Sequence, residues 1–263
     1  MASFTALYSG SSGNAALIQE KAGSLCVDMG KNCKTTLAAL SQAGVEPRSL
    51  QGILVTHEHV DHVSGLRVFL KRYPVPVYAS GKTLESLLYR QLVPPGAKLC
   101  VLEEQKTAIG PFAVTAFPTS HDAADCHGFR IQAESGGTLA LATDLGCVTE
   151  PVYQNLRGAD LVVLEANYDA AMLQQGPYPA YLKARIASSR GHLCNTDTAA
   201  ALAKLLQEGC QRFALCHLSS ENNTPERALQ TVTRAFLEKG ALPGKDGLLV
   251  ALRRRCVSPT LAF

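Results

Sequence analysis

Residues 57–62, which read HEHVDH, constrain the fold more than any other part of the chain. They follow the apolar stretch GILVT, which is typical of a buried strand, and precede a segment of helical period. In an extended turn, residues two apart project to the same side. His57 and His59 can therefore bind one ion while Asp61 and His62 reach another. Because imidazole and carboxylate suit zinc, manganese or iron, the run predicts a metal site where a strand ends and a helix begins.

Two metal sites need more ligands than this run supplies, and three later residues stand where predicted strands end. They are His121 after FAVTAFPTS, Asp144 after TLALAT and His217 after RFALC. An acid such as Asp144 can bridge two ions with its two oxygens, which a histidine cannot do. Taken singly, each of the three could equally be an ordinary polar residue at a strand end.

The composition is that of an ordinary globular protein, with 46% hydrophobic and 18% charged residues among 263. A chain of this length can bury a sizeable core without cross-links. The nine cysteines are odd in number, scattered and never spaced as C-x-x-C, which indicates reduced thiols rather than a disulfide framework or a zinc ribbon. A net charge of +3 is too small to identify a nucleic-acid partner by itself.

Targeting and membrane signals are missing from the sequence. No uncharged apolar run approaches the roughly 18 residues needed to span a bilayer. The N-terminal stretch MASFTALYSGSSGN lacks the basic and apolar regions of a secretion signal. We therefore expect a soluble, cytoplasmic protein with no membrane partner.

Short apolar runs rich in β-branched residues are interspersed with longer segments of helical period. We predict strands near 4–8, 14–19, 24–28, 52–56, 76–79, 98–102, 112–118, 127–134, 138–143, 160–165, 212–216 and 247–252. We predict helices near 33–43, 63–72, 82–91, 149–157, 178–188, 196–208 and 225–239. Because strands come in runs, mixed sheets with helices on their outer faces fit better than a doubly wound parallel sheet. No linker divides the chain, so we expect a single domain over residues 1–263.

Four boundaries have specific residue signals. They are Gly44 after the first helix, Gly136 and Gly137 as a hairpin turn, Asn195 or Thr196 as a helix cap, and Thr224 with Pro225 as the cap and first residue of the last helix.

Together these motifs resemble those of the metallo-β-lactamase-fold hydrolases, and the resemblance covers nearly the whole chain. The matching segments are LCVDMG with Asp28, THEHVDH, His121, ATDLG with Asp144, and His217. The resemblance implies an α/β fold, a four-layer αβ/βα sandwich of two mixed sheets with helices outside and metals at one edge. It implies that His57, His59 and His121 hold one ion, that Asp61, His62 and His217 hold a second, and that Asp144 bridges them. Asp28 would then orient the histidine loop.

Departures from some branches of this family argue against antibiotic hydrolysis, against oxygen reduction and against the larger nucleases. Asp144 stands where true β-lactamases of this fold commonly have a cysteine, and His59 stands where oxygen-reducing flavo-diiron members have an acid. Between Asp144 and His192 there is no room for the inserted helical domain of the larger RNA-processing and repair nucleases.

The segments SGSSGNA, LEANYD, GPYPAYLKARI, RGHLCN and CHLSSENN resemble those of the compact bacterial YycJ/WalJ branch. That resemblance implies a 5′ to 3′ DNA exonuclease. Tyr168 and Cys194 depart from this branch, in which His and Ser are frequent at the two positions. Tyr168 removes one extra proton donor or phosphate contact but leaves the metal ligands untouched.

His192 is the main candidate outside the ligand set. It could protonate a leaving alkoxide or bind a phosphate oxygen, and the alternative is a capping or core histidine. We expect further substrate contacts from Ser12 and Asn14 in the Gly-Ser loop, and from Arg190 and Asn195 on either side of His192. For the loop, the alternative is an ordinary Gly-Ser turn. Lys183 and Arg185, or Arg67 and Lys71, could contact a nucleic-acid backbone or could simply be solvated.

The sequence therefore predicts a metal-dependent hydrolase, and specifically a phosphodiesterase or nuclease that acts on DNA in preference to RNA. Two divalent ions, zinc or manganese with iron as an alternative, would hold a hydroxide that attacks phosphorus. Asp61 and Asp144 would position it, and His192 would act as the acid. The alternatives are a glyoxalase-like hydrolase of a thioester, lactone or cyclic phosphodiester, and a non-catalytic DNA-binding regulator. The sequence leaves the oligomeric state open.

Overall fold

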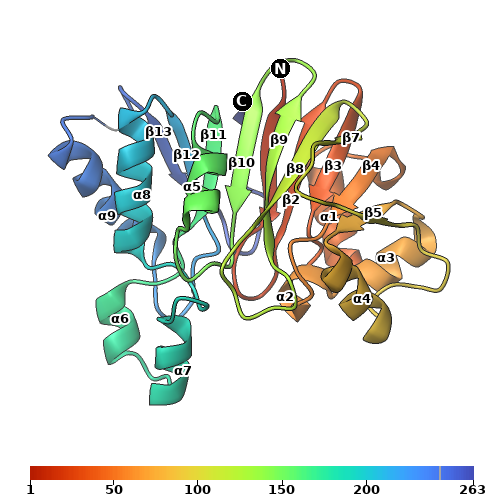
Figure 1. Ribbon diagram of the computed structural model, residues 1–263, viewed down its shortest axis with the longest axis horizontal. Helices are drawn as coiled ribbons and strands as arrows, with labels where there is room; N and C mark the ends of the chain where they lie inside the picture. The colour runs from red at the N-terminus through yellow and green to blue at the C-terminus, as the bar shows by residue number, and fades with distance from the viewer. Residues whose placement is uncertain (243) are drawn as a thin grey trace.

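The computed structural model describes residues 1–242 and 244–263, and within these residues fourteen strands form two sheets of seven (Figure 1). The first sheet has the order β14-β1-β2-β3-β4-β5-β6. Its strands are β1 (Ser3–Tyr8), β2 (Ala15–Glu20), β3 (Gly23–Val27), β4 (Leu50–Leu54), β5 (Val77–Ala79), β6 (Leu99–Val101) and β14 (Leu261–Ala262). Pairing is antiparallel from β14 to β3 and parallel from β3 to β6, so this sheet is mixed.

The second sheet also has an antiparallel half and a parallel half, and its strand order is β13-β12-β11-β10-β9-β8-β7. Its strands are β7 (Thr107–Ile109), β8 (Phe112–Pro118), β9 (His127–Ala133), β10 (Thr138–Ala142), β11 (Leu161–Glu165), β12 (Arg212–Cys216) and β13 (Leu248–Ala251). Strands β7 to β10 pair antiparallel, and β10 to β13 pair parallel. As a result β8, β10, β11 and β12 all run in the same direction and end at the same edge.

Helices cover the outer face of each sheet (Figure 1). Helices α1 (Cys33–Gln42), α3 (Leu66–Arg72) and α4 (Gly81–Tyr89) pack on the first sheet, and α5 (Glu150–Leu156), α8 (Asn195–Gln207) and α9 (Pro225–Glu238) pack on the second. The short elements η1 (Pro47–Ser49), α2 (Val60–Val63), α6 (Ala170–Gln175) and α7 (Ala180–Ile186) lie in the connections. The predicted four-layer sandwich of two mixed sheets with helices outside is confirmed.

The main core lies between the two sheets, and strand alternation explains how it forms. In β11, Leu161 and Val163 join the cluster between the sheets, whereas Val162 and Leu164 join the cluster beneath the helices. A strand with apolar side chains on both faces must be covered on both sides. The near-continuous apolar runs in the sequence thus required both a second sheet and an outer helix layer.

Predicted and observed elements differ where tertiary contacts outweigh local pattern. The sequence did not predict the short strands β7 and β14 or the helix α6, and the predicted helix 63–72 is split into α2 and α3. The split falls at Gly65, where a Cβ would collide with the carbonyl oxygen of Lys31. Helix α2 begins at Val60, so Asp61 and His62 lie on a helical turn rather than in an extended loop.

Three of the four predicted element boundaries are confirmed. Gly44 follows the last cap of α1 with φ of 71°, Thr224 caps α9, and residues 134–137 turn between the antiparallel strands β9 and β10. The predicted cap of α8 was wrong. Cys194 takes that position, and its Sγ accepts a hydrogen bond from the backbone N–H of Asp197.

No helix in the two described ranges combines the length and apolarity needed to cross a membrane.

The core between the sheets makes a testable contribution to stability. Phe129 in β9 is fully buried there, so Phe129→Ala should lower the free energy of unfolding by about 3–5 kcal/mol through lost burial and a cavity. Urea denaturation followed by circular dichroism measures this loss. Val101→Ala, at a strand residue that is 57% exposed, is the control and should change stability little. An equal loss in both variants would contradict this account of the core.

Candidate metal centre

The predicted ligands meet at the edge of the sandwich where the parallel strands end. Asp28 follows β3, and residues 57–62 follow β4 in the first sheet. From the second sheet, His121 lies beyond β8, Asp144 beyond β10 and His217 directly after β12. The two sheets thus contribute ligands to one site, although these residues are spread over 190 positions of sequence between Asp28 and His217.

Three of these residues have backbone torsions that side chains other than glycine rarely adopt. Asp28, Asp144 and His217 have φ of 60°, 56° and 52°. Such conformations cost on the order of 1–3 kcal/mol each and persist only where the surrounding structure imposes them. Asp28 and His217 directly follow the last residue of their strands, and Asp144 stands two residues after the end of β10. The left-handed turn directs the chain abruptly away from the sheet at the point where the side chain is needed.

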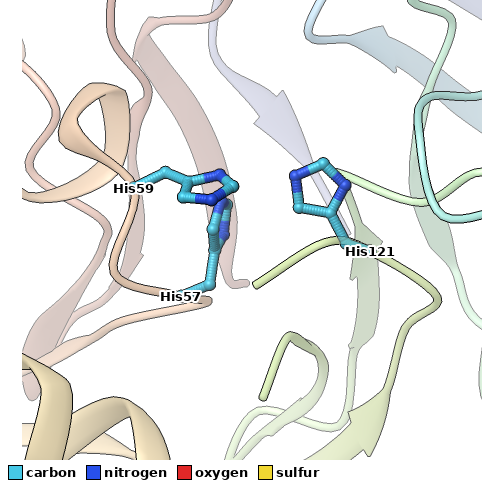
Figure 2. Close-up of side chains that lie close together, drawn as sticks. All are labelled: His57, His59 and His121. Carbon is cyan, nitrogen blue, oxygen red and sulfur yellow. The ribbon is translucent and has the colours of Figure 1, made fainter. Parts of the chain in front are cut away.

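His57, His59 and His121 form the first group, with one ligand atom from each lying within 4.8 Å of the others (Figure 2). The ring centroids of His57 and His59 are 4.5 Å apart, and each is 5.2 Å from that of His121. His121 Nδ1 donates to the carbonyl oxygen of Gly191 at 2.9 Å, which leaves its Nε2 for an ion. His57 Nε2 is buried without a hydrogen-bond partner. Three imidazoles of this kind are a typical zinc-binding set.

Asp61, His62 and His217 form the second group. One carboxylate oxygen of Asp61 lies 3.6 Å from the Nε2 atoms of both histidines. His217 Nε2 is a further buried nitrogen without a hydrogen-bond partner. Buried polar atoms in proteins are nearly always bonded, so two unpaired imidazole nitrogens at one site indicate positions that an ion would satisfy.

Asp144 lies between the two groups. Its Oδ2 is 3.2 Å from His62 Nε2, and its Oδ1 is 3.2 Å from His217 Nδ1 and 3.8 Å from His121 Nε2. The side chain is 2% exposed. The two oxygens therefore face histidines of both groups, as a bridging carboxylate requires.

Asp28 makes three hydrogen bonds to the histidine loop. It accepts hydrogen bonds from His62 Nδ1 at 2.7 Å, from the backbone N–H of Thr56 at 2.8 Å and from the Thr56 hydroxyl at 2.9 Å. Because Nδ1 of His62 donates to this carboxylate, Nε2 is the nitrogen presented to the ligand cluster. Carboxylate partners of this kind fix the ring and raise its basicity as a ligand.

Glu165 makes comparable contacts on the opposite side of the site, and sequence reasoning missed it. Its Oε1 accepts from His192 Nδ1 at 2.8 Å and from His217 Nδ1 at 3.0 Å, and its Oε2 accepts from the backbone N–H of Leu145. The side chain is fully buried. A signal was present in the sequence, since a glutamate that ends the buried strand LVVLE must have partners.

Electrostatics differ between the two groups. Burial and the neighbouring charge of His62 lower the pKa of His57 well below its usual value, which favours the neutral imidazole that binds metals. Burial also disfavours the charged forms of His62 and His217, but the carboxylate of Asp144 and its acidic neighbours outweigh burial and raise both pKa values well above the usual range. The second group therefore attracts positive charge, which a divalent cation supplies.

The other candidates lie around this cluster in different environments. His192 is partly exposed, and its Nδ1 is bonded to Glu165. Asn14 is buried, and its amide Nδ2 lies 3.1 Å from His62 Nε2, so it contacts the ligands themselves. Arg190 donates to the carbonyl oxygen of His121, and Ser12 is exposed at the loop tip.

Asn195 has no free group for a substrate. Its side chain is 2% exposed, and its amide nitrogen and oxygen are both bonded to the amide of Asn223, at 3.0 and 2.8 Å. Its role is to join the start of α8 to the loop after β12. Because the amide is turned inward, Asn195 also cannot cap the helix.

Comparison with known proteins agrees with this geometry. The family model described as the beta-lactamase superfamily domain matches residues 28–217, from Asp28 to His217. The chain belongs to this superfamily. It is 38% identical over 240 residues to the exodeoxyribonuclease YycJ of Bacillus anthracis, covering 90% of both chains. It is 34% identical over 247 residues to the exodeoxyribonuclease WalJ of Streptococcus pneumoniae, covering 92% of this chain and 91% of that one.

Solved structures share the fold at lower identity. The metallo-β-lactamase fold protein YhfI of Bacillus subtilis has a TM-score of 0.73 at 18% identity and covers 98% of both chains. Zinc-bound PqqB of Methylobacterium extorquens has a TM-score of 0.72 at 17% identity, covering 98% of this chain and all of that one. At these identities the comparison establishes the architecture.

The carboxylate of Asp28 should control how tightly the centre binds metal. Asp28→Asn removes the charge beside His62 Nδ1, and loss of such a partner typically lowers metal affinity about 10- to 100-fold. Competition of the protein with a chromogenic chelator for zinc measures this change. Asp125→Asn is the matched control, because its carboxylate lies 4.0 Å from His127 and outside the ligand groups. Equal zinc affinity in the two variants would contradict the assigned role.

Proposed function

We propose that this protein is a metal-dependent nuclease that removes nucleotides from the 5′ end of DNA strands. Its relatives in Bacillus anthracis and Streptococcus pneumoniae are named exodeoxyribonucleases, and their similarity extends over about nine tenths of the chain. The observation that carries the proposal is the pair of ligand groups on either side of Asp144, with two buried imidazole nitrogens free.

The donor set fits two divalent cations, zinc or manganese, with iron as the alternative. His57, His59 and His121 would hold one ion, Asp61, His62 and His217 would hold the other, and Asp144 would contact both. Such ions supply an acidified water molecule and positive charge for the phosphate oxygens.

The residues around the ligands would orient the reaction. The carboxylates of Asp61 and Asp144 can accept hydrogen bonds from an attacking water and fix its direction. His192 lies on the open side of the cluster, with its ring centroid 5.1 Å from that of His121 and 5.3 Å from that of His217. Since Nδ1 of His192 donates to Glu165, Nε2 is the atom that would pass a proton to the leaving 3′ oxygen.

Basic side chains near the cluster suit a nucleic-acid strand. Arg190 lies directly beside His121, and Lys183 and Arg185 are on α7, which leads to it. Electrostatic contacts with phosphates supply most sequence-independent affinity for DNA. Lys183 donates to the backbone of Gln174 and Arg185 is paired with Asp122, while Arg67 donates to the backbone of Gln91 just after α4.

Loss of the ligands should abolish activity without loss of the fold. His59→Ala and Asp61→Ala should each reduce hydrolysis of single-stranded and 5′-phosphorylated duplex DNA to background, and chelation of the wild-type protein should do the same until zinc or manganese is restored. Circular dichroism tests the fold.

His127→Ala is the control, because His127 belongs to no ligand group among the described residues. Full DNA hydrolysis by a metal-free Asp61→Ala protein would refute the proposal. Turnover of a glutathione thioester with no turnover of DNA would favour the small-molecule hydrolase, and DNA binding without cleavage under any divalent ion would favour a regulator.

The role of His192 depends on the leaving group. His192→Ala should slow cleavage of DNA by roughly 10²- to 10⁴-fold, because an alkoxide needs a proton as it leaves. The same variant should hydrolyse bis(p-nitrophenyl) phosphate at nearly the wild-type rate, because p-nitrophenolate leaves without one. An equal loss on both substrates would assign His192 to metal or phosphate binding instead.

A further inference from the structure

Residues 166–194 form an arm that projects from the sandwich. In Figure 1 its helices α6 and α7 extend beyond the site edge of the second sheet, away from the layer formed by α5, α8 and α9. Helix α7 has no buried residue, and α6 has only Leu173. The arm therefore adds little to the main core, and its apolar side chains pack elsewhere.

A small apolar cluster holds the arm in place. Tyr168, Leu173 and Cys194 are buried together, and Tyr178 and Ile186 pack against them. The base of the arm is closed by a β-bridge between Tyr168 and Cys194 and by a hydrogen bond from the backbone N–H of Asp169 to Asn222. Tyr178 is thus held by this cluster and is only half-buried.

The end of the arm contacts the metal centre directly. Gly191 accepts the hydrogen bond from His121 Nδ1, and the backbone N–H of His192 donates to Ile186 at the end of α7. Arg185 on α7 lies 2.6 Å from Asp122, the residue after His121. The position of α7 is therefore coupled to the position of a predicted ligand.

A cleft of about 190 Å³ separates α7 from the centre. Its lining includes three apolar side chains, Tyr178, Leu182 and Ile186, together with His121 and His192. The rest of the lining is mainly polar, with Ser11, Asn167 and Ser219 and the ion pair of Arg185 with Asp122. A ligand that fits must therefore offer an apolar surface to the first three side chains and hydrogen-bonding groups to the polar ones.

We propose that this cleft binds the nucleoside adjacent to the phosphate that is cleaved, with its base against the ring of Tyr178. This inference rests on the proposed nuclease function and names the residues that bind its substrate. A nucleobase offers an apolar face and a polar edge, which match the apolar and the polar parts of this lining. Because every base has such a face, stacking on an aromatic side chain tolerates any sequence. The cleft accordingly accepts all four nucleotides.

The test compares substitutions of Tyr178 with one at Tyr181. Tyr181 is on the same helix but is 76% exposed and does not line the cleft, so Tyr181→Leu is the matched control. Inhibition of DNA hydrolysis by deoxyadenosine 5′-monophosphate and by deoxyribose 5-phosphate isolates the contribution of the base.

The quantity to compare is the ratio of the two inhibition constants, that of the sugar phosphate divided by that of the nucleotide. In the wild-type protein and in Tyr181→Leu this ratio should be about ten or more, in line with the usual contribution of stacking to binding. In Tyr178→Leu this ratio should fall to about one, and the KM for single-stranded DNA should rise about tenfold while kcat changes little. Tyr178→Phe keeps the ring and should behave as the wild type. A general loss of arm structure would lower kcat and would not selectively change the inhibitor ratio.

Two results would overturn the inference while leaving the proposed function intact. One is an unchanged inhibitor ratio in a folded Tyr178→Leu protein that still degrades DNA. The other is an equal loss of the ratio in Tyr178→Phe and Tyr178→Leu, which would show that the hydroxyl rather than the ring makes the contact. Failure of the wild-type, metal-loaded protein to degrade DNA would overturn both the function and this inference.

Discussion

Pairing of buried carboxylates with imidazoles at the edge of the sandwich is the interaction on which the rest of the structure depends. Asp28, Asp144 and Glu165 are each at most 2% exposed. A carboxylate this far from water costs several kcal/mol unless it is paired, and removal of one partner leaves an uncompensated charge. Each of the three contacts at least one histidine, so the ligands and their supports form one interdependent unit. Asp144 contacts rings of both ligand groups, whereas Asp28 and Glu165 contact His62 and His217 of the second group.

The sandwich provides the rigidity that this unit requires. Val27 and Leu54, shortly before Asp28 and the histidine loop, are in the core between the sheets, and so are Leu141 and Cys216, shortly before Asp144 and His217. Packing of the two sheets thereby fixes the ends of the strands that carry the site. The strained backbone at Asp28, Asp144 and His217 is held by the same packing. The packing that stabilises the core therefore also fixes the geometry of the metal centre.

The arm of residues 166–194 has a different physical character. It contributes one small apolar cluster, and only seven of its 29 residues are buried, yet its end lies against His121. A segment that is lightly packed can vary in sequence without loss of the sandwich. The candidate ligands thus stand at strand ends fixed in the core, while the shape of the cleft beside them depends on the arm.

Hydrophobic period is a local property, and it predicted twelve of the fourteen strands and the outer helices. Residue type at strand ends, together with the family resemblance, singled out the seven candidate ligands. Strand β8 was even predicted at the bounds that it has in the structure. Tertiary structure decided the rest. Only the fold could bring Glu165 beside His192 and His217, turn Asn195 inward to Asn223, and split the helix after residues 57–62 where Lys31 crowds Gly65. Each of these depends on contacts between residues far apart in the chain, and no local pattern records which distant group will occupy the space beside a given side chain.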